Sequence, residues 1–278
     1  MKALIIGATG LLGKALTREW SGDEVVGLGS RDVDIRDADK VREAVEGYRP
    51  DWIVLAAAYT NVDDCESHPE LAFAVNRDGA VNVAKAARRI DAKLLFLSSD
   101  YVFDGRKTSP YKAEDERNPQ SVYGRSKAEA EVRLLEVLPE CCIARTSWLF
   151  GTGGKCFPDT ILKLAATRPA LDVVSDQRGS PTYSVDLSRA IVKLCRSHAS
   201  GIVHVTNAGE CSWFEFAREI VKGGGLATDV RPVSSQQMAR PAPRPAYSVL
   251  SAESLQPYGV TMPTWQDALQ RYLRERGN

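Results

Sequence analysis

A tyrosine and a lysine stand four residues apart, as Tyr123 and Lys127, in a segment with helical spacing. Residues at i and i+4 share one face of a helix, so the phenol and the ammonium group are expected side by side. A free tyrosine titrates near about 10, and a neighbouring cation favours the phenolate and lowers that pKa. Such a pair can donate a proton near neutral pH, although the spacing alone more often marks an exposed surface pair.

Two serines, Ser98 and Ser99, follow the apolar run Lys93–Leu97, which predicts a buried strand. A serine hydroxyl near the tyrosine can hydrogen-bond a carbonyl oxygen and help to polarise it. Because this strand directly precedes the helix of Tyr123 and Lys127, we predict that Ser99, Tyr123 and Lys127 form a catalytic set. The chemistry that such a set suits is carbonyl reduction by a bound hydride donor, with the lysine also holding the ribose of that donor.

A glycine-rich turn, Gly7-Ala-Thr-Gly10-Leu-Leu-Gly13, lies between the apolar run Lys2–Ile6 and a segment with helical spacing. Glycines let the backbone approach a pyrophosphate closely, and a helix N-terminus offers free N–H groups and partial positive charge. This is the position of the dinucleotide site in a Rossmann unit. The spacing GxxGxxG, in place of the commoner GxGxxG, resembles the short-chain dehydrogenase/reductase superfamily.

The end of the second predicted strand indicates which dinucleotide is bound. A carboxylate there often holds the ribose 2′-hydroxyl of NAD, but the residues are Gly27-Leu-Gly-Ser30-Arg31, with no acid before Asp32. Arg31 could pair with a 2′-phosphate, or it could be a solvated loop residue. We therefore expect NADPH as the cofactor, with NADH as the alternative.

The first half of the chain alternates between apolar runs and segments with helical spacing. Strands are predicted at Lys2–Ile6, Glu24–Val26, Trp52–Leu55, Lys93–Leu97 and Cys141–Arg145, and helices at Leu11–Trp20, Ala38–Tyr48, Glu70–Arg89 and Ser121–Leu138. This alternation predicts an α/β fold, a Rossmann-type doubly wound parallel sheet with helices on both faces. Residues 1–150 are expected to form the NADP-binding domain.

The regular alternation loosens after Gly151, where glycine and proline punctuate the chain. Helices are predicted at Asp186–Cys195, Trp213–Val221 and Trp265–Leu273, a strand at Ile202–Val205 and an extended loop at Gln236–Tyr247. We expect residues 151–278 to form mainly a smaller C-terminal substrate-binding lobe, with segments near 183–206 returning to the Rossmann sheet.

Composition excludes several classes of function. Lys and Arg number 36, as do Asp and Glu, so no net field favours nucleic acid or a membrane surface as a partner. The six cysteines form no CxxC pair, and the three histidines are scattered, so neither residue type suggests a metal site. With no apolar run of membrane-spanning length and no secretory leader, a cytoplasmic protein is expected.

The chain resembles the dTDP-4-dehydrorhamnose reductase family along nearly its whole length. The segments that carry the resemblance are Gly7–Gly13, Ala56–Asp63, Ser99–Gly105, Tyr123–Lys127, Arg145–Gly151, Asp176–Thr182 and Arg244–Leu250. The resemblance implies NADPH-dependent reduction of the C4 ketone of dTDP-4-dehydro-6-deoxy-L-mannose to dTDP-L-rhamnose. It also implies that the substrate is a dTDP-linked 4-keto-6-deoxysugar.

The resemblance further implies which residues would bind the two ligands. Cofactor contacts are implied for Gly7, Thr9, Gly10, Leu11, Leu12, Gly13, Ser30, Arg31, Asp34, Ile35, Ala56, Ala57, Ala58, Thr60, Asn76, Tyr123 and Lys127. Substrate contacts are implied for Val102, Phe103, Trp148, Arg178 and Ser180. An indole such as Trp148 suits a sugar ring, unless it is a core aromatic, and Arg178 suits a diphosphate.

Three positions depart from the family pattern. Ala15 stands where members that dimerise through magnesium carry a glutamate ligand, and alanine offers no oxygen to a hard cation. A magnesium site is therefore doubtful, no other metal is expected, and a monomer or weak homodimer is predicted. Ser99 replaces a frequent threonine but keeps the hydroxyl, and Tyr247 replaces a frequent asparagine, which could alter substrate selection.

Two alternatives to this function stay open. One is a reductase of another dTDP-4-keto-deoxysugar, because a few hydrogen bonds separate epimeric sugars. The other is a non-catalytic NADP-binding regulatory subunit similar to that of methionine adenosyltransferase. A sugar-nucleotide dehydratase is disfavoured, because Asp100 is followed by Tyr101 and not by the glutamate of those enzymes.

Overall fold

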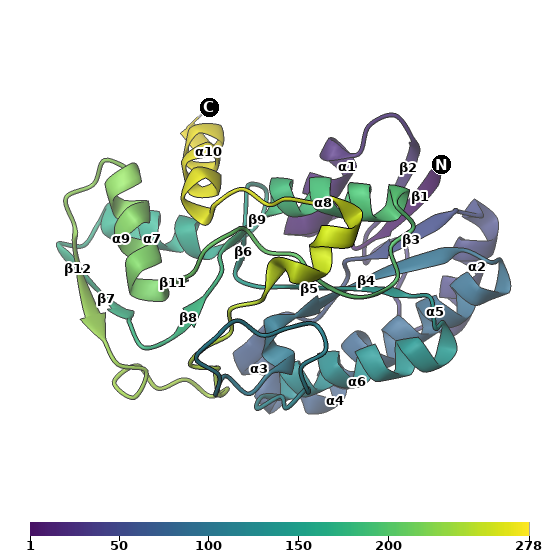
Figure 1. Ribbon diagram of the computed structural model, residues 1–278, viewed down its shortest axis with the longest axis horizontal. Helices are drawn as coiled ribbons and strands as arrows, with labels where there is room; N and C mark the ends of the chain where they lie inside the picture. The colour runs from purple at the N-terminus through teal and green to yellow at the C-terminus, as the bar shows by residue number, and fades with distance from the viewer. Residues whose placement is uncertain (278) are drawn as a thin grey trace.

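A six-stranded parallel sheet forms the centre of the molecule in this computed structural model, which describes residues 1–277 (Figure 1). Its strands are β1 (Lys2–Ile6), β2 (Glu24–Leu28), β3 (Trp52–Leu55), β4 (Lys93–Ser99), β5 (Cys142–Thr146) and β10 (Gly201–His204). They lie in the order β10-β5-β4-β3-β1-β2, and every neighbouring pair is parallel. The order reverses between β1 and β3, and a crevice is expected outside the carboxyl ends of strands at such a point.

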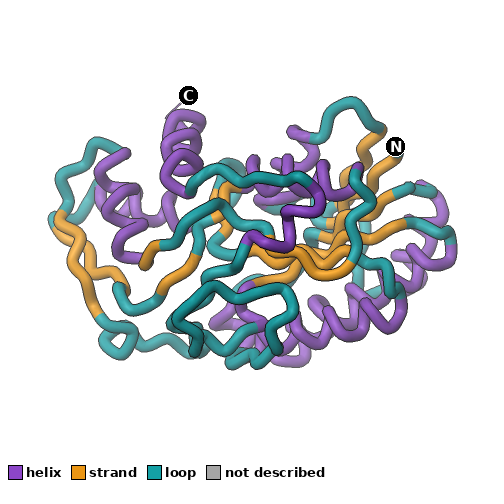
Figure 2. Tube along the Cα trace, viewed as in Figure 1, coloured by secondary structure: helices purple, strands orange, loops and turns teal. Residues whose placement is uncertain are grey.

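Helices cover both faces of this sheet (Figures 1 and 2). α1 (Leu11–Glu19) packs against α8 (Ser184–Arg196) on one face, and α2 (Ala38–Tyr48), α5 (Ala80–Arg89) and α6 (Val122–Val137) cover the other. The predicted α/β fold with a Rossmann-type doubly wound sheet is thereby confirmed. None of the helices in residues 1–277 is long and apolar enough to cross a membrane.

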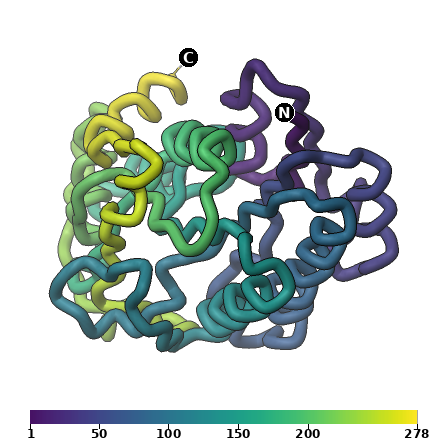
Figure 3. Tube along the Cα trace, turned by 45° about the vertical axis from the view of Figure 1, so that its right-hand side comes forward, coloured from purple at the N-terminus to yellow at the C-terminus, as the bar shows by residue number. Residues whose placement is uncertain are grey.

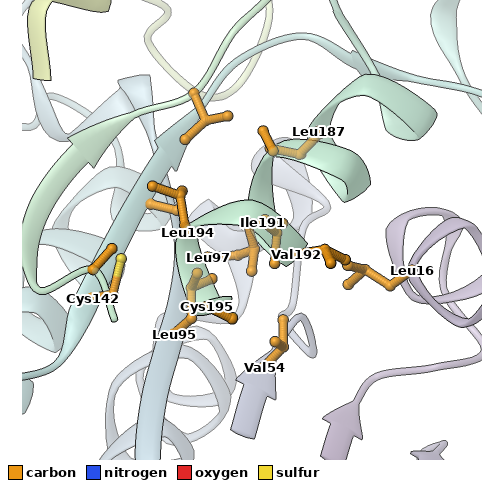
Figure 4. Packing of buried hydrophobic residues seen from close by; sticks show 14 of the residues in the cluster. Leu16, Val54, Leu95, Leu97, Cys142, Leu187, Ile191, Val192, Leu194 and Cys195 are labelled. Carbon is orange, nitrogen blue, oxygen red and sulfur yellow. The ribbon is translucent and has the colours of Figure 1, made fainter. Parts of the chain in front are cut away.

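Successive residues of each strand supply the two cores in turn. On β4, Leu95 and Leu97 pack toward α8, whereas Leu94 and Phe96 pack toward the helices of the opposite face. Figure 4 shows the first of these cores, in which leucines and Ile191 of α8 meet the side chains of the sheet. Burial on both faces explains why the strands are almost continuously apolar in sequence.

One predicted helix contains an irregular turn. The segment expected as a single helix at Glu70–Arg89 consists of α4 (Pro69–Phe73), a π-helical stretch (Ala74–Gly79) and α5. A π-helical turn widens the helix locally and often occurs at functional sites. A further short helix, α3 (Val62–Ser67), begins after Asn61, whose side chain caps it by accepting from the Asp64 amide.

The second half of the chain builds its own core beside the sheet. Its elements include α7 (Phe157–Ala165), α9 (Trp213–Gly223), α10 (Trp265–Gly277) and the paired strands β7 (Ala170–Val174) and β12 (Asp229–Val233). Short strands β6 (Leu149–Phe150), β8 (Arg178–Gly179), β9 (Thr182–Tyr183) and β11 (Cys211–Ser212) connect these elements. Residues 236–247 form a loop without helix or strand, as predicted.

A long loop ties the two halves together. The loop between β4 and α6 extends toward the C-terminal segments, which Figure 3 shows from a second direction. Tyr111 forms a bridge with Leu250, and the Gly105 carbonyl accepts a hydrogen bond from the Tyr247 amide at 3.2 Å. Segments far apart in sequence are therefore held at one side of the sheet's carboxyl edge.

A fully buried ion pair joins α6 to β5. Glu131 accepts from Arg145 through both carboxylate oxygens, at 2.9 and 2.6 Å, and also from Ser98 at 2.5 Å and Arg117 at 3.1 Å. Burial alone would raise the pKa of the Glu131 carboxyl, but these donors outweigh it and hold the pKa below its ordinary value. Burial lowers the pKa of the adjacent His204 to about 3, so this histidine is neutral beside Arg145.

Removing one partner of this pair should destabilise the protein strongly. Glu131→Ala leaves Arg145 charged and buried without a carboxylate, so unfolding in urea should become easier by about 3–5 kcal/mol. Glu129→Ala, two residues away on α6, breaks an exposed pair with Arg77 and should change stability by less than about 0.5 kcal/mol. Equal effects of the two substitutions would contradict the assignment of a structural role to Glu131.

Candidate active site

A cavity of about 460 Å³ lies at the carboxyl ends of β1, β3, β4 and β5. It lies at the point where the strand order reverses, as expected for an open α/β sheet. The residues of the predicted site that line it are Gly7, Gly10, Leu11, Leu12, Gly13, Ala56, Ala58, Thr60, Ser99, Tyr123, Lys127 and Trp148. The structure therefore brings the glycine turn, the predicted catalytic set and one predicted substrate residue together in the lining of one cavity, here called the cavity wall.

The glycine turn fits a diphosphate because its backbone leaves no room for side chains. Gly7 has φ +98°, and a Cβ there would lie 2.5 Å from the Ala57 nitrogen. A Cβ on Gly13 would lie 2.1 Å from the Gly7 carbonyl oxygen. α1 starts after Gly10 without a side-chain cap, so the N–H groups of its first turn can meet an anion.

The residues expected at the adenosine end lie outside this cavity. Ser30 and Arg31 are exposed at the end of β2. The Oδ2 atom of Asp32 accepts from the Gly29 amide at 2.7 Å. The Thr9 side chain lies against Gly29, where a Cβ would approach it to 2.6 Å. Arg31 is therefore a cation without a carboxylate partner among residues 1–277 at this edge.

Two further predicted cofactor residues pack beside this edge. Ile35 is buried, and its side chain fills the space at Gly79, where a Cβ would lie 2.7 Å away. The carboxylate of Asp34 is held by Arg36 at 2.6 Å, and this bond lowers the pKa of Asp34 to about 2. Both residues shape the wall beside the second strand.

Asn76 lies behind the cavity in the π-helical stretch. Its amide oxygen accepts from the Tyr59 nitrogen at 2.8 Å, and its amide nitrogen donates to the Tyr59 carbonyl and to the Ser126 hydroxyl. Asn76 thus ties the loop after β3 to α6, the helix that carries Tyr123. Ala57 also lies off the wall, packed against Gly7 with its amide bound to the Ile6 carbonyl.

The three predicted catalytic residues meet at the cavity wall. Ser99 ends β4, and Tyr123 and Lys127 lie on α6, whose first turn is capped by Ser121 accepting from the Gly124 amide. The Ser99 hydroxyl donates to Asp100 at 2.9 Å and accepts from the Tyr101 amide at 3.2 Å. The sequence spacing therefore identified a set of side chains that the fold places together.

The pKa of Tyr123 is set by burial and not by Lys127. Burial raises the pKa of Tyr123, and the Ser99 hydroxyl acts in the opposite direction. Burial lowers the pKa of Lys127 to about 7, against the charge of Glu131. The ammonium group donates to the Leu97 carbonyl, 4.0 Å above the Phe96 ring. Lys127 does not lower the pKa of the phenol as predicted, because burial dominates both groups.

A pair of indoles forms the side of the cavity that faces the second half of the chain. Trp148, with φ +47°, stacks on Trp213 with ring centroids 3.5 Å apart and an angle of 6°. Gly179 makes room for Trp148, since a Cβ there would lie 2.5 Å from the indole. The helix that begins at Trp213 was predicted from the sequence, and the capping box of Ser212 and Glu215 fixes its first turn, but the place of Trp213 at the cavity was not predicted.

Four predicted substrate residues lie away from the cavity wall. Val102 and Phe103 are buried in a cluster with Tyr111, and neither side chain lines the cavity. Ser180 is buried and donates to the Gly209 carbonyl at 2.8 Å. The guanidinium of Arg178 is paired with Glu210 and Glu215 at 3.0 and 3.2 Å on the C-terminal lobe.

The cavity also has lining residues that sequence reasoning missed. They are Val62, Leu97, Ser98, Asp100, Tyr101, Thr146, Ser147, Leu149, Lys155 and Trp213. Most adjoin predicted residues, because the carboxyl ends of β4 and β5 both reach the wall. Lys155 and Trp213 carry no such signal, since only the folded arrangement brings them to the glycine turn.

Gly13→Ala should abolish dinucleotide binding, because its methyl group would collide with backbone atoms of the Gly7 turn. We expect the Kd for NADPH, measured by fluorescence titration, to rise at least 10-fold and the Tm to fall. Gly47→Ala is the matched control, since a Cβ on this glycine of α2 meets nothing within 4 Å. That control should keep the wild-type Kd and gain about 0.5–1 kcal/mol of helix stability. An unchanged Kd for NADPH in Gly13→Ala would contradict the assignment of the Gly7–Gly13 turn as the binding site of the dinucleotide.

Comparison with known proteins shows which family the chain belongs to. The family model of the RmlD substrate binding domain matches residues 1–277. The spore coat polysaccharide biosynthesis protein SpsK of Bacillus subtilis is 43% identical over 100% of this chain and 98% of that protein. A dTDP-4-dehydrorhamnose reductase of Mycolicibacterium smegmatis is 40% identical over 97% of this chain and 84% of its own length.

A solved structure extends the comparison to three dimensions. The crystal structure of dTDP-4-dehydrorhamnose reductase from Bacillus anthracis in complex with NADP has a TM-score of 0.96 and 38% identity, covering 99% of each chain. The agreement spans the Rossmann sheet and the C-terminal lobe alike. Because both sequence and fold match over their full lengths, this chain belongs to the dTDP-4-dehydrorhamnose reductase family.

Proposed function

We propose that this protein reduces the C4 ketone of dTDP-4-dehydro-6-deoxy-L-mannose with NADPH, giving dTDP-L-rhamnose. The observation that carries the proposal is one cavity wall that combines the Gly7–Gly13 turn, Ser99, Tyr123, Lys127 and the indole of Trp148. The relative from Mycolicibacterium smegmatis is named for this reaction, and the Bacillus anthracis structure contains NADP.

The residues of the wall have complementary roles in such a reduction. When bound, NADPH supplies the hydride. Tyr123 carries its proton at neutral pH, because burial raises its pKa, and it can give that proton to the oxygen of the ketone. The Ser99 hydroxyl binds the same oxygen and stabilises the charge that develops there.

Lys127 would act on the state that follows proton transfer. With its pKa lowered to about 7 by burial, the amine can take up a proton near neutral pH. A charged Lys127 opposes the negative charge left on Tyr123 and can bind the ribose hydroxyls of the cofactor. Lys127 would have to exchange its hydrogen bond to the Leu97 carbonyl for these partners.

The C-terminal lobe would select the sugar. The exposed face of the stacked pair Trp148 and Trp213 suits the C–H surface of a hexose ring. Tyr247, which replaces a frequent asparagine, donates to Glu210 at 2.8 Å, and Glu210 in turn holds Arg178. Because these contacts replace those of an asparagine, a different dTDP-4-keto-deoxysugar is the second candidate substrate.

The remaining features of the proposal concern metal, assembly and compartment. Residue 15 is a buried alanine, so we propose a monomer or weak homodimer that needs no magnesium bridge. We also propose that the enzyme works in the cytoplasm without nucleic acid or membrane partners. All six cysteines are free, buried thiols, which suits a reducing compartment.

The proposed reaction is tested by mixing the protein with NADPH and dTDP-4-dehydro-6-deoxy-L-mannose and following the absorbance of the reduced nicotinamide. Tyr123→Phe should lower kcat by about 10²–10⁴-fold while the Kd for NADPH changes less than about 3-fold. Tyr48→Phe, a change at an exposed residue of α2, should leave both values unchanged. Near-normal turnover by Tyr123→Phe would remove the phenol as proton donor, and NADPH binding without any turnover by the wild type would favour the regulatory-subunit alternative.

Arg31 should determine the preference for NADPH over NADH. Arg31→Ala removes the cation proposed to pair with the 2′-phosphate, so the KM for NADPH should rise about 10-fold, equivalent to roughly 1.4 kcal/mol. The KM for NADH should change less than about 2-fold, since NADH lacks that phosphate. Arg42→Ala on α2 serves as a control for loss of surface charge. An equal rise in the KM values for NADPH and NADH would show that Arg31 does not bind the 2′-phosphate of NADPH.

A further inference from the structure

The hydroxyl of Ser99 already donates a hydrogen bond within the folded protein. It is donated to Oδ1 of Asp100 at 2.9 Å, while the Ser99 oxygen accepts from the Tyr101 amide at 3.2 Å. A hydroxyl has one hydrogen to donate. As long as Asp100 is an ionised acceptor, Ser99 cannot donate to a ketone oxygen without breaking this bond.

Asp100 lies in surroundings that disfavour a charge. It is 1% exposed, and its Oδ2 atom is buried without a hydrogen-bond partner among residues 1–277. An ionised carboxylate buried without full hydrogen bonding costs much more free energy than a protonated carboxyl in the same place. Burial accordingly raises the pKa of Asp100 to about 6, and it outweighs hydrogen bonding from Ser248, from Ser99 and from the backbone amides of Asp100 and Tyr101, which acts to lower this pKa.

The groups around Asp100 supply no compensating cation. Tyr101 and Tyr123 face it from its own turn and from α6, and burial raises the pKa of each phenol, so both are neutral. Lys127 donates to the Leu97 carbonyl. Arg244 and Asp63 lie beyond Tyr101 and pair with each other at 2.8 Å, which balances their charges.

We propose that Asp100 is a positioning residue that works as a neutral acid, donating a hydrogen bond to Ser99 and so turning the Ser99 hydrogen toward the ketone. The inference deepens the proposed reductase function and rests on it. Asp100 keeps its proton through the reaction. The proton that the product gains comes from Tyr123, and the hydride comes from the cofactor, so only the direction of one hydrogen bond changes at Asp100.

Bound ligands would strengthen this arrangement. NADPH and a dTDP-sugar each carry a diphosphate, and filling the cavity removes water from it. Negative charge and desolvation both disfavour a second carboxylate charge, so the neutral form of Asp100 should persist to higher pH in the ternary complex than in the free protein. A family site with a threonine in place of Ser99 would meet the same constraint, since it also has one hydrogen.

The first test measures the charge of Asp100 in the folded chain without turnover. In Asp100→Asn the amide cannot titrate, so the Tm difference between this variant and the wild type reports the ionisation of Asp100. Between the unfolded-state pKa of 3.8 and the folded-state pKa of about 6, the folded wild type binds more protons and loses stability as pH rises. The variant should therefore gain Tm relative to the wild type from pH 4 to pH 7. A difference that does not change with pH would overturn the proposal.

The second test follows the ratio of kcat for Asp100→Asn to kcat for the wild type as pH rises. The Asn amide donates permanently to Ser99, as the neutral acid does, so the ratio should start near 1 at about pH 6 and rise about 10-fold by pH 9. Titration of Tyr123 and Lys127 cancels in this ratio, because both proteins contain them. In the Ser99→Ala background the ratio should stay flat, because Asp100 acts through that hydroxyl.

Matched controls separate a positioning role from a structural one. Asp104→Asn alters another carboxylate of the same segment, one that binds Tyr111 and Asn118 outside the cavity, and its kcat ratio should not vary with pH. A flat ratio for Asp100→Asn beside an active wild type would overturn the inference while leaving the reductase function intact. Absence of turnover by the wild type with any dTDP-4-keto-sugar would overturn the function and the inference together.

Discussion

The buried ion pair between Glu131 and Arg145 is the interaction on which the geometry of the site depends. Tyr123, Lys127 and Glu131 follow one another at intervals of four residues, so they share one face of α6. The third of them is fixed to β5 by two hydrogen bonds to Arg145 and to β4 by one from Ser98. A helix anchored in this way holds the proposed proton donor at a constant position against the end of β4.

Anchoring α6 by a charge pair has an electrostatic consequence at the cavity. Arg145 and Arg117 compensate Glu131, so little of its negative charge is left to stabilise an ammonium one turn away. Burial then prevails at Lys127, and it prevails likewise at Tyr123 and Asp100. The cavity wall therefore favours neutral side chains. The diphosphate of the proposed cofactor would bring negative charge, and Lys127 is the group whose protonation that charge would favour.

Sequence reasoning recovered the parts of the fold that follow from local patterns. The strands of the sheet were predicted because both faces are buried, and the glycine turn because close backbone contacts at Gly7 and Gly13 exclude side chains. The π-helical turn at Ala74–Gly79 was not predicted, because one additional residue in a turn barely disturbs the helical periodicity of the sequence. The strands β7 and β12 also escaped, because each contains charged residues and lies outside the doubly covered sheet.

Differences between the predicted site residues and the cavity lining have another physical origin. Resemblance locates a residue along the chain, but the side on which it packs depends on long-range contacts. Phe103 stacks on Tyr111 at 4.2 Å, away from the cavity, because the loop after β4 folds back toward Leu250. Trp213 reaches the wall for the opposite reason, since α9 comes from a distant part of the chain and stacks on Trp148.

The division of the wall between two parts of the chain bears on how such enzymes diverge. The glycine turn and the proposed catalytic set come from the parallel sheet and α6, whereas Lys155 and Trp213 come from later segments. The Tyr247–Glu210–Arg178 contacts, which lie away from the wall, also belong to those later segments. Substitutions in the later segments can reshape the sugar pocket without moving Glu131 or the helix that it anchors. Asp100 connects the two parts of the chain. It binds the hydroxyl of Ser99 at the end of β4, and Ser248 of the later loop acts to lower its pKa. A change in that loop would therefore alter the proposed orientation of the Ser99 hydroxyl, which couples substrate selection to catalysis at one carboxyl group.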